Sequence, residues 1–303
     1  MVFVLLSLLQ KDLRIKNKKQ SNLPNMHLYL YADLILLKVH DYWYHVPFRS
    51  WDELINRQGL HDFLQNAYPD WEMAAAIPTQ TPLAPIGQQE VWASGVTYQK
   101  SKEARMEEAK EAGGGDFYDR VYDADRPELF FKASPHRVVG PEGNLRIRQD
   151  STWDVPEPEL TLFICSQGTI EGYTIGNDMS SRSIEGENPL YLPQAKTYDA
   201  SAGLGPCLYV PAQPISPQTE IKLQIFRAGA EVFAESIQLS RMKRTLSELA
   251  AYLYRECSFP HGCFLMTGTG IVPPDSFTLQ AGDRVEISIE NIGQLKNMIV
   301  TKG

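Results

Sequence analysis

The stretch Trp153-Asp154-Val155-Pro156-Glu157-Pro158-Glu159-Leu160 places two glutamates two residues apart, directly before the apolar run LTLFI at 160–164. Pro156 and Pro158 disfavour a helix and favour an extended backbone. Alternate residues of an extended chain point to one face, so Glu157 and Glu159 should hold their carboxylates close together. The sequence therefore predicts an acidic pair at the start of a buried strand.

A cation is the simplest neutraliser for like charges held this close in a low-dielectric interior. A third carboxylate, Asp178, follows the strand-like run GYTI at 172–175. Three oxygen ligands without Cys or His suit Mg²⁺, with Mn²⁺ or Ca²⁺ as alternatives, rather than zinc. Spacing alone fits the solvated face of an edge strand better, because charged residues commonly alternate there. The prolines and Asp178 favour a metal site more than spacing alone does. Both interpretations, a metal site and a solvated edge strand, stay open at this point.

Outward from this stretch, the larger part of the chain is mostly β. The runs IKLQIF (221–226) and VEISIE (285–290) have the composition of strands. Two helices are predicted among them. One covers 101–112 (SKEARMEEAKEA), and the other opens at the capping-box sequence TLSE (245–248) and continues to about Glu256. These patterns predict an α+β fold that is mostly β.

A smaller unit precedes this part. Strand-like pieces between His27 and Pro47 are followed by a helical pattern from Ser50 to about Ala67, and prolines enrich 78–85. We therefore expect a small N-terminal α/β domain at 26–85 and a catalytic domain at 86–303. Residues 1–25 combine an apolar run with a basic run, and nine apolar residues are too few for a span of about 20. We expect them to be an extension that is disordered or not native, with Met26 as the true start.

Bulk composition limits the function classes. Hydrophobic residues make up 43% and the formal net charge is −8, which fits a globular protein and disfavours nucleic-acid binding. The four cysteines form no C-x-x-C pair, so we expect reduced core thiols in a cytoplasmic protein without a membrane segment.

Six motifs, in order, resemble the fumarylacetoacetate hydrolase superfamily and together cover roughly residues 90–300. They are RPELFFKASPHRVVGP (126–141), EPEL (157–160), GYTIGNDMSSRS (172–183), QAKTYDASAGLGP (194–206), TGTG (267–270) and IENIGQLKN (289–297). The resemblance implies a mixed β-sandwich roll that forms a homodimer or homotetramer, with the active site beneath a short helical lid. It also implies a small 2-oxo acid as the substrate.

The same resemblance implies roles for individual residues. Glu157, Glu159 and Asp178 match the three metal carboxylates, Lys196 matches the lysine that reaches the metal site, and Thr269 matches the turn that meets the substrate carboxylate. Three further side chains are expected to contact the substrate: Tyr98, Lys132 and Arg182. Lys132 and Arg182 fit equally well as braces for the carboxylates.

The chain departs from the superfamily's hydrolases in the lid. Ser101 and Ala104 stand where those hydrolases carry the histidine and glutamate that activate water, and neither residue can act as a base at neutral pH. The run NDMSSRSIEGENPLYLPQAK (177–196) instead resembles the 2-keto-3-deoxypentonate dehydratases of the superfamily.

This second resemblance implies loss of water from a 2-keto-3-deoxy sugar acid through a metal-stabilised enolate, giving 2,5-dioxopentanoate. The alternative is an acylpyruvate-type hydrolase or a 2-oxo acid decarboxylase on the same metal scaffold. Lys196 is the first choice for proton transfer, with Glu185 and Glu128 as partners. Both glutamates also fit ordinary solvated salt bridges.

Overall fold

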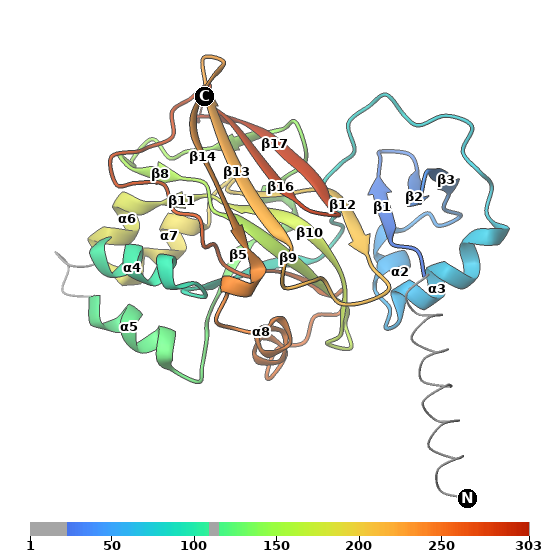
Figure 1. Ribbon diagram of the computed structural model, residues 1–303, viewed down its shortest axis with the longest axis horizontal. Helices are drawn as coiled ribbons and strands as arrows, with labels where there is room; N and C mark the ends of the chain where they lie inside the picture. The colour runs from blue at the N-terminus through green and yellow to red at the C-terminus, as the bar shows by residue number, and fades with distance from the viewer. Residues whose placement is uncertain (1–22, 109–114, 303) are drawn as a thin grey trace, which may run out of the picture.

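The computed structural model describes residues 23–108 and 115–302. The fold is mostly β, with two larger sheets packed face to face and a cluster of short helices at one end (Figure 1). This architecture confirms the predicted mixed β-sandwich.

The larger sheet has ten strands. Its order is β3 (Tyr42–His45), β2 (Ile35–Val39), β1 (Met26–Leu30), β12 (Ala202–Val210), β10 (Ile170–Asp178), β9 (Pro158–Ile164), β15 (Cys263–Met266), β4 (Glu90–Gly95) and β5 (Glu128–Ala133), with β6 (Val138–Val139) paired to β12. The five-stranded sheet has the order β14 (Ala230–Gln238), β13 (Glu220–Arg227), β16 (Arg284–Ile289), β17 (Gly293–Val300) and β7 (Asn144–Arg146). A two-stranded ribbon joins β11 (Ser180–Ser181) and β8 (Asp154–Val155).

Strand β9 lies at the centre of the packing because all seven of its residues are buried. Leu160 and Leu162 belong to the core shared with β13 and β16, whereas Phe163 belongs to the core on the other face, with the N-terminal strands. A strand covered on both faces reads as a continuous apolar run, which explains the sequence LTLFI. The strand thus has little freedom to move, and it carries the acidic pair at its start.

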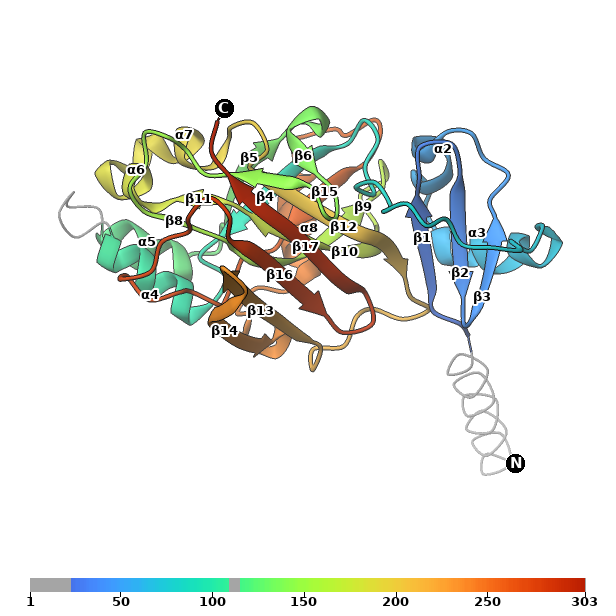
Figure 2. The ribbon, with the colours of Figure 1, turned by 90° about the horizontal axis from the view of Figure 1, so that it is seen from above.

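The N-terminal strands extend the larger sheet, since β1 pairs antiparallel with β12 (Figure 2). The single helix predicted from Ser50 to Ala67 is wrong in one respect. It forms two helices, α2 (Trp51–Ile55) and α3 (Leu60–Ala67), separated at Gly59, whose φ of 74° is left-handed. The domain boundary at residue 85 stays a prediction. The proposed start at Met26 also stays a prediction, because residues 1–22 lie outside the described residues.

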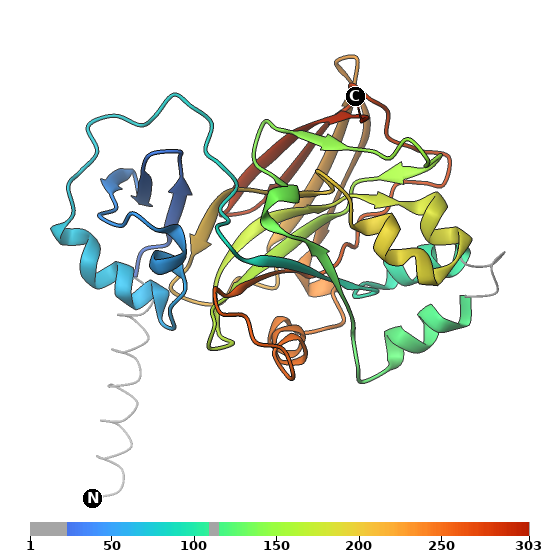
Figure 3. The same cartoon turned by 180° about the vertical axis from the view of Figure 1, so that it is seen from behind.

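Four helices gather at the end of the molecule away from β1–β3 (Figures 1 and 3). They are α4 (Gln99–Glu108), α5 (Gly115–Asp123), α6 (Arg182–Glu187) and α7 (Leu192–Lys196). The predicted helix at 101–112 corresponds to α4, and its last four positions lie outside the described residues. Helix α8 (Leu246–Leu253) opens with the predicted capping box between Thr245 and Glu248. Short 3-10 turns cover Tyr68–Asp70, Pro135–Arg137, Pro189–Tyr191 and Leu239–Arg241.

The cysteines follow the expectation with one exception. Cys165, Cys207 and Cys263 are buried free thiols, but Cys257 is exposed, so the prediction of a core thiol is wrong for that residue. Within residues 23–108 and 115–302, no helix combines the length and apolarity that a membrane span requires.

Candidate active site and metal centre

Three carboxylates meet where β9 and β10 run side by side. The antiparallel register sets Gly176 opposite Glu159, which brings the end of β10 and its Asp178 to the start of β9. One oxygen from each of Glu157, Glu159 and Asp178 lies within 4.8 Å of the other two. All three residues are at most 4% exposed, so the solvated-edge interpretation is wrong and the predicted acidic cluster is confirmed.

The electrostatics of this triad favour a bound cation. Burial, reinforced by the charges of Asp178 and Glu157, raises the pKa of Glu159 well above its usual value. A carboxylate that is costly to ionise in this way is stabilised when a cation binds beside it. Clustered carboxylate oxygens are also the ligands that Mg²⁺ prefers. The residues present therefore fit a magnesium ion.

Two fully buried lysines flank the triad. Lys196, the last residue of α7, contacts Glu157 and places its Nζ 3.2 Å from Asp178 Oδ2. Lys132 of β5 places its Nζ 2.6 Å from Asp178 Oδ1 and donates to the carbonyl oxygen of Met179 at 2.9 Å. Burial acts to raise the pKa of Asp178, but the two lysines outweigh it and hold that pKa below its usual value. Burial lowers the pKa of Lys132.

An arginine completes the surroundings of Glu157. Arg182, the first residue of α6, donates from Nη2 to Glu157 Oε1 at 2.9 Å. Burial, with a smaller effect from Arg105, lowers the pKa of Arg182 to about 9. Arg182 and Lys132 thus contact the carboxylates of Glu157 and Asp178, as expected of residues that brace the metal ligands. Their contact with substrate stays a prediction.

Glu159 accepts a hydrogen bond from a backbone amide, whereas Glu157 is bonded by lysine and arginine side chains. The amide of Gly268 donates to Glu159 Oε2 at 2.6 Å, and Gly268 has a φ of 92° that favours glycine. The neighbouring Thr269 is 4% exposed, and its hydroxyl exchanges hydrogen bonds with the backbone of Ile271. The turn TGTG therefore lies beside the triad, and the role of Thr269 toward substrate stays a prediction.

Tyr98 contributes a buried hydroxyl near the same carboxylate. The residue is 1% exposed, and its hydroxyl has no hydrogen-bond partner among the described residues. Burial and the charge of Glu159 raise the pKa of Tyr98. A buried hydroxyl without a partner is available to a bound ligand.

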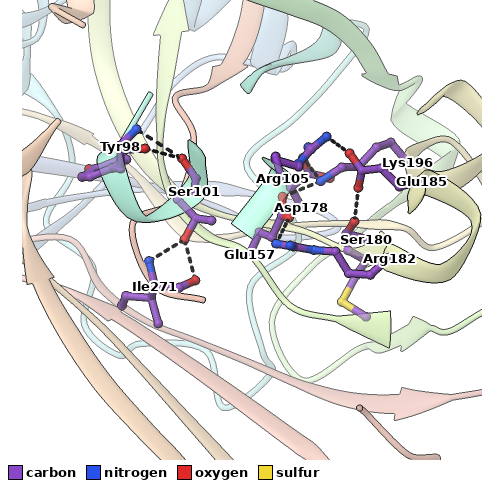
Figure 4. Close-up of polar contacts among 12 residues, drawn as sticks. Tyr98, Ser101, Arg105, Glu157, Asp178, Ser180, Arg182, Glu185, Lys196 and Ile271 are labelled. Carbon is purple, nitrogen blue, oxygen red and sulfur yellow. Dashed lines mark hydrogen bonds and ion pairs between the residues drawn. The ribbon is translucent and has the colours of Figure 1, made fainter. Parts of the chain in front are cut away.

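The two glutamates predicted for proton transfer have different surroundings. Glu185 is 2% exposed, accepts from Ser180 Oγ at 2.9 Å and pairs with Arg105 of α4 (Figure 4). Glu128, at the start of β5, is half-buried and packs its carboxylate against Gly95. Glu185 thus lies among buried charged side chains, whereas Glu128 lies beside β4, the strand that precedes α4.

Sequence reasoning missed Arg105. Its position four residues after Ser101 puts both side chains on one helix face, and that spacing was the only available signal. The Ser101 hydroxyl donates to the carbonyl oxygen of Tyr98 at 2.8 Å, so the lid serine caps its own turn.

Comparison with known proteins agrees with this geometry. The profile of the family described as "Fumarylacetoacetate (FAA) hydrolase C-terminal" matches residues 90–300. The chain is 49% identical over 218 residues to a probable 2-keto-3-deoxyxylonate dehydratase of Haloferax volcanii, covering 72% of this chain and 74% of the relative. It is 44% identical over 213 residues to the 2-dehydro-3-deoxy-D-arabinonate dehydratase of Saccharolobus solfataricus, covering 70% and 72% respectively.

A solved structure extends the similarity to the N-terminal strands. The 2-keto-3-deoxy-D-arabinonate dehydratase complexed with magnesium and 2,5-dioxopentanoate superposes with a TM-score of 0.77 at 32% identity, covering 92% of this chain and 99% of that one. The family profile covers well over half of the sequence, and the predicted motifs stand at the site that the fold assembles. The chain belongs to the fumarylacetoacetate hydrolase family.

Proposed function

We propose that this protein is a Mg²⁺-dependent hydro-lyase that converts a 2-keto-3-deoxypentonate into 2,5-dioxopentanoate and water. The observation that carries the proposal is the buried triad of Glu157, Glu159 and Asp178, flanked by Lys132 and Lys196. Relatives 44% and 49% identical to this chain are named as dehydratases of such acids. When bound to the three carboxylates, Mg²⁺ would supply Lewis-acid chemistry toward a 2-oxo acid.

Elimination removes one proton from C3 and the hydroxyl group from C4 of the substrate. We assign the C3 proton to Lys196, which solvent does not reach and which can return the proton to the departing hydroxyl, so that water leaves. The positive charges of Lys132 and Arg182 favour binding of the substrate anion. The hydroxyl of Tyr98 is available to hydrogen-bond a substrate oxygen.

The unsaturated product then isomerises to the aldehyde. C5 and its hydroxyl group each lose one proton, C5 becomes the carbonyl carbon, and C3 and C4 each gain one proton. We assign the C5 proton to Glu185, because a carboxylate paired with a guanidinium stays ionised and can act as a base. Glu128 is the alternative base for this step. Thr269, in the turn beside Glu159, is proposed to hold the substrate carboxylate.

Turnover assays test the proposal. Purified protein with Mg²⁺ should form 2,5-dioxopentanoate from at least one 2-keto-3-deoxypentonate stereoisomer, detected by NMR of the aldehyde proton. EDTA should stop the reaction, and Lys196→Met should lower kcat by a factor of about 10² to 10⁴. Absence of turnover with every stereoisomer would refute the proposal, and efficient cleavage of an acylpyruvate would favour a hydrolase instead.

We also propose a homodimer or homotetramer in the cytoplasm. The resemblance to the superfamily supports the assembly, and the buried free thiols of Cys165, Cys207 and Cys263 fit a reducing compartment. Size-exclusion chromatography with light scattering measures the assembly, and a monomer at micromolar concentration would contradict it.

A further inference from the structure

Helix α4 meets the rest of the site through a polar face. Among its residues with described side chains, the buried ones are Ser101 and Arg105, while Gln99 and Lys100 are exposed. The Ser101 hydroxyl is used within the helix's own first turn. The contact of α4 with α6 therefore depends strongly on the guanidinium of Arg105.

The partner of that guanidinium is also buried. The side chain of Arg105 is 5% exposed and that of Glu185 is 1% exposed, and the two are paired directly. Removing either residue would take a buried ion-pair partner from the other, which is strongly unfavourable. The pair thus ties the position of α4 to the position of one carboxylate on α6.

This carboxylate stands next to the proposed metal ligands. Glu185 accepts from Ser180, which is two residues beyond Asp178, and it is three residues beyond Arg182 on the same helix. Arg182 in turn bonds Glu157. Figure 4 shows Arg105 reaching from α4 toward Glu185 and Arg182. Helix α4, which stands at the position of the lid, is therefore connected to the triad through α6.

We propose that Arg105 is a positioning residue that fixes the carboxylate of Glu185 for proton transfer and holds α4 over the site. The inference rests on the proposed function. It assigns a role to the lid of this chain, in which the water-activating pair is replaced by Ser101 and Ala104. Helix α4 thus contributes a cation that keeps a base in place.

Kinetics of Arg105→Ala test the inference. We expect kcat to fall about 100-fold, as for a misplaced catalytic group, with KM changed less than threefold. Methylguanidinium should restore part of kcat, whereas methylammonium should not, because only a planar guanidinium matches the carboxylate. The double variant Arg105→Ala/Glu185→Gln should be no slower than the slower single variant.

Lys102→Ala is the matched control. It removes another ion pair of α4, between Lys102 and Asp119 on α5 at 3.0 Å, and should keep kcat near the wild-type value. Hydrogen exchange in Gln99–Glu108 should accelerate in Arg105→Ala and in Glu185→Gln more than in Lys102→Ala. Should Arg105→Ala fail to fold, Arg105→Lys serves instead, with about a tenfold loss of kcat expected.

Wild-type kcat in the Arg105 variants, or loss of kcat with neither guanidinium rescue nor faster exchange in α4, would overturn the inference. Failure of the proposed function has a different signature, because wild-type protein would then turn over no substrate. The exchange of α4 would still report whether Arg105 and Glu185 hold the lid.

Discussion

Glu157, directly before β9, and Glu159, within β9, are two residues apart, yet their partners differ. Glu157 is paired with Arg182 and Lys196, whereas Glu159 accepts only from the amide of Gly268 among the contacts of the described residues. Removing the charge of Glu157 therefore takes one ion-pair partner from each of two buried cations, and removing the charge of Glu159 relieves a repulsion. The same Glu→Gln substitution should have opposite consequences at the two positions.

Glu157→Gln should lower the free energy of unfolding of the metal-free protein by about 3 kcal/mol, because it breaks buried ion pairs. Glu159→Gln should preserve or raise it, since the raised pKa of Glu159 makes its ionised form costly at neutral pH. Both variants should lose most of their Mg²⁺ affinity. Urea unfolding in EDTA and calorimetric titration with Mg²⁺ measure these effects, and equal stability of the two variants would contradict the assigned pairs.

The raised pKa of Asp154, which lies outside the triad, predicts that the free energy of unfolding depends on pH. Burial raises its pKa to about 6, against weaker opposing hydrogen bonds from Ser151 and the backbone. The folded protein therefore keeps a proton that the unfolded chain loses above pH 3.8, so stability falls as pH rises from about 4 to 6. Asp154→Asn should be more stable than wild type by up to about 3 kcal/mol at pH 7, with the gap closing toward pH 4. Thermal melts across this range test it, and a pH-independent gap would be inconsistent with that titration.

At the scale of elements, one arginine joins α8 to α5, the helix on which α4 packs. Arg244, at the start of α8, is 7% exposed and donates to the carbonyl oxygens of Val121 and Asp125, at 3.1 and 3.0 Å, and to that of Ala124. These carbonyls belong to the last turn of α5 and the residues after it, where helical carbonyls lack intrahelical partners. The order of α5, and of α4 packed on it, should therefore depend on Arg244.

Arg244→Ala should cost about 1–3 kcal/mol of stability and accelerate hydrogen exchange in Gly115–Asp123, because three carbonyls at the end of α5 lose their side-chain donor. Thr245→Ala is the neighbouring control. It removes the N-cap of α8 at a cost of about 1 kcal/mol but leaves the carbonyls of α5 bonded. Equal exchange of Gly115–Asp123 in the two variants would show that Arg244 does not hold α5.

At the scale of the whole molecule, the triad lies where two buried strands of the large sheet pair. Strand β9 is buried on both faces and β10 pairs along it, so the ligands are held by elements that open only with the whole sheet. An ion that binds the folded protein and not the unfolded chain stabilises the fold as a whole.

Mg²⁺ at 100 times its Kd should therefore raise the free energy of unfolding of wild-type protein by about 2.7 kcal/mol. The gain should vanish in Glu159→Gln, which lacks one ligand but is expected to fold. Calorimetric melts with Mg²⁺ and with EDTA measure the difference. An equal gain in the variant would place the ion elsewhere.

The sequence by itself determined the strands of the core, the capping box of α8 and the close placement of Glu157 and Glu159. These features depend on short-range rules: alternation along a strand, the restriction that proline places on its neighbours, and the two-residue repeat that puts Glu157 and Glu159 on one face. The family motifs then pointed to Lys196 and Asp178, which the fold brings into contact.

Only the tertiary structure decided which distant groups meet. The pairing of β1 with β12 and the contact between Arg105 and Glu185 join residues far apart in the chain. No local pattern specifies such partners, because several strands and several charges satisfy the same local rules. The choice among them depends on burial of the two cores and on the need of each buried charge for a counter-ion.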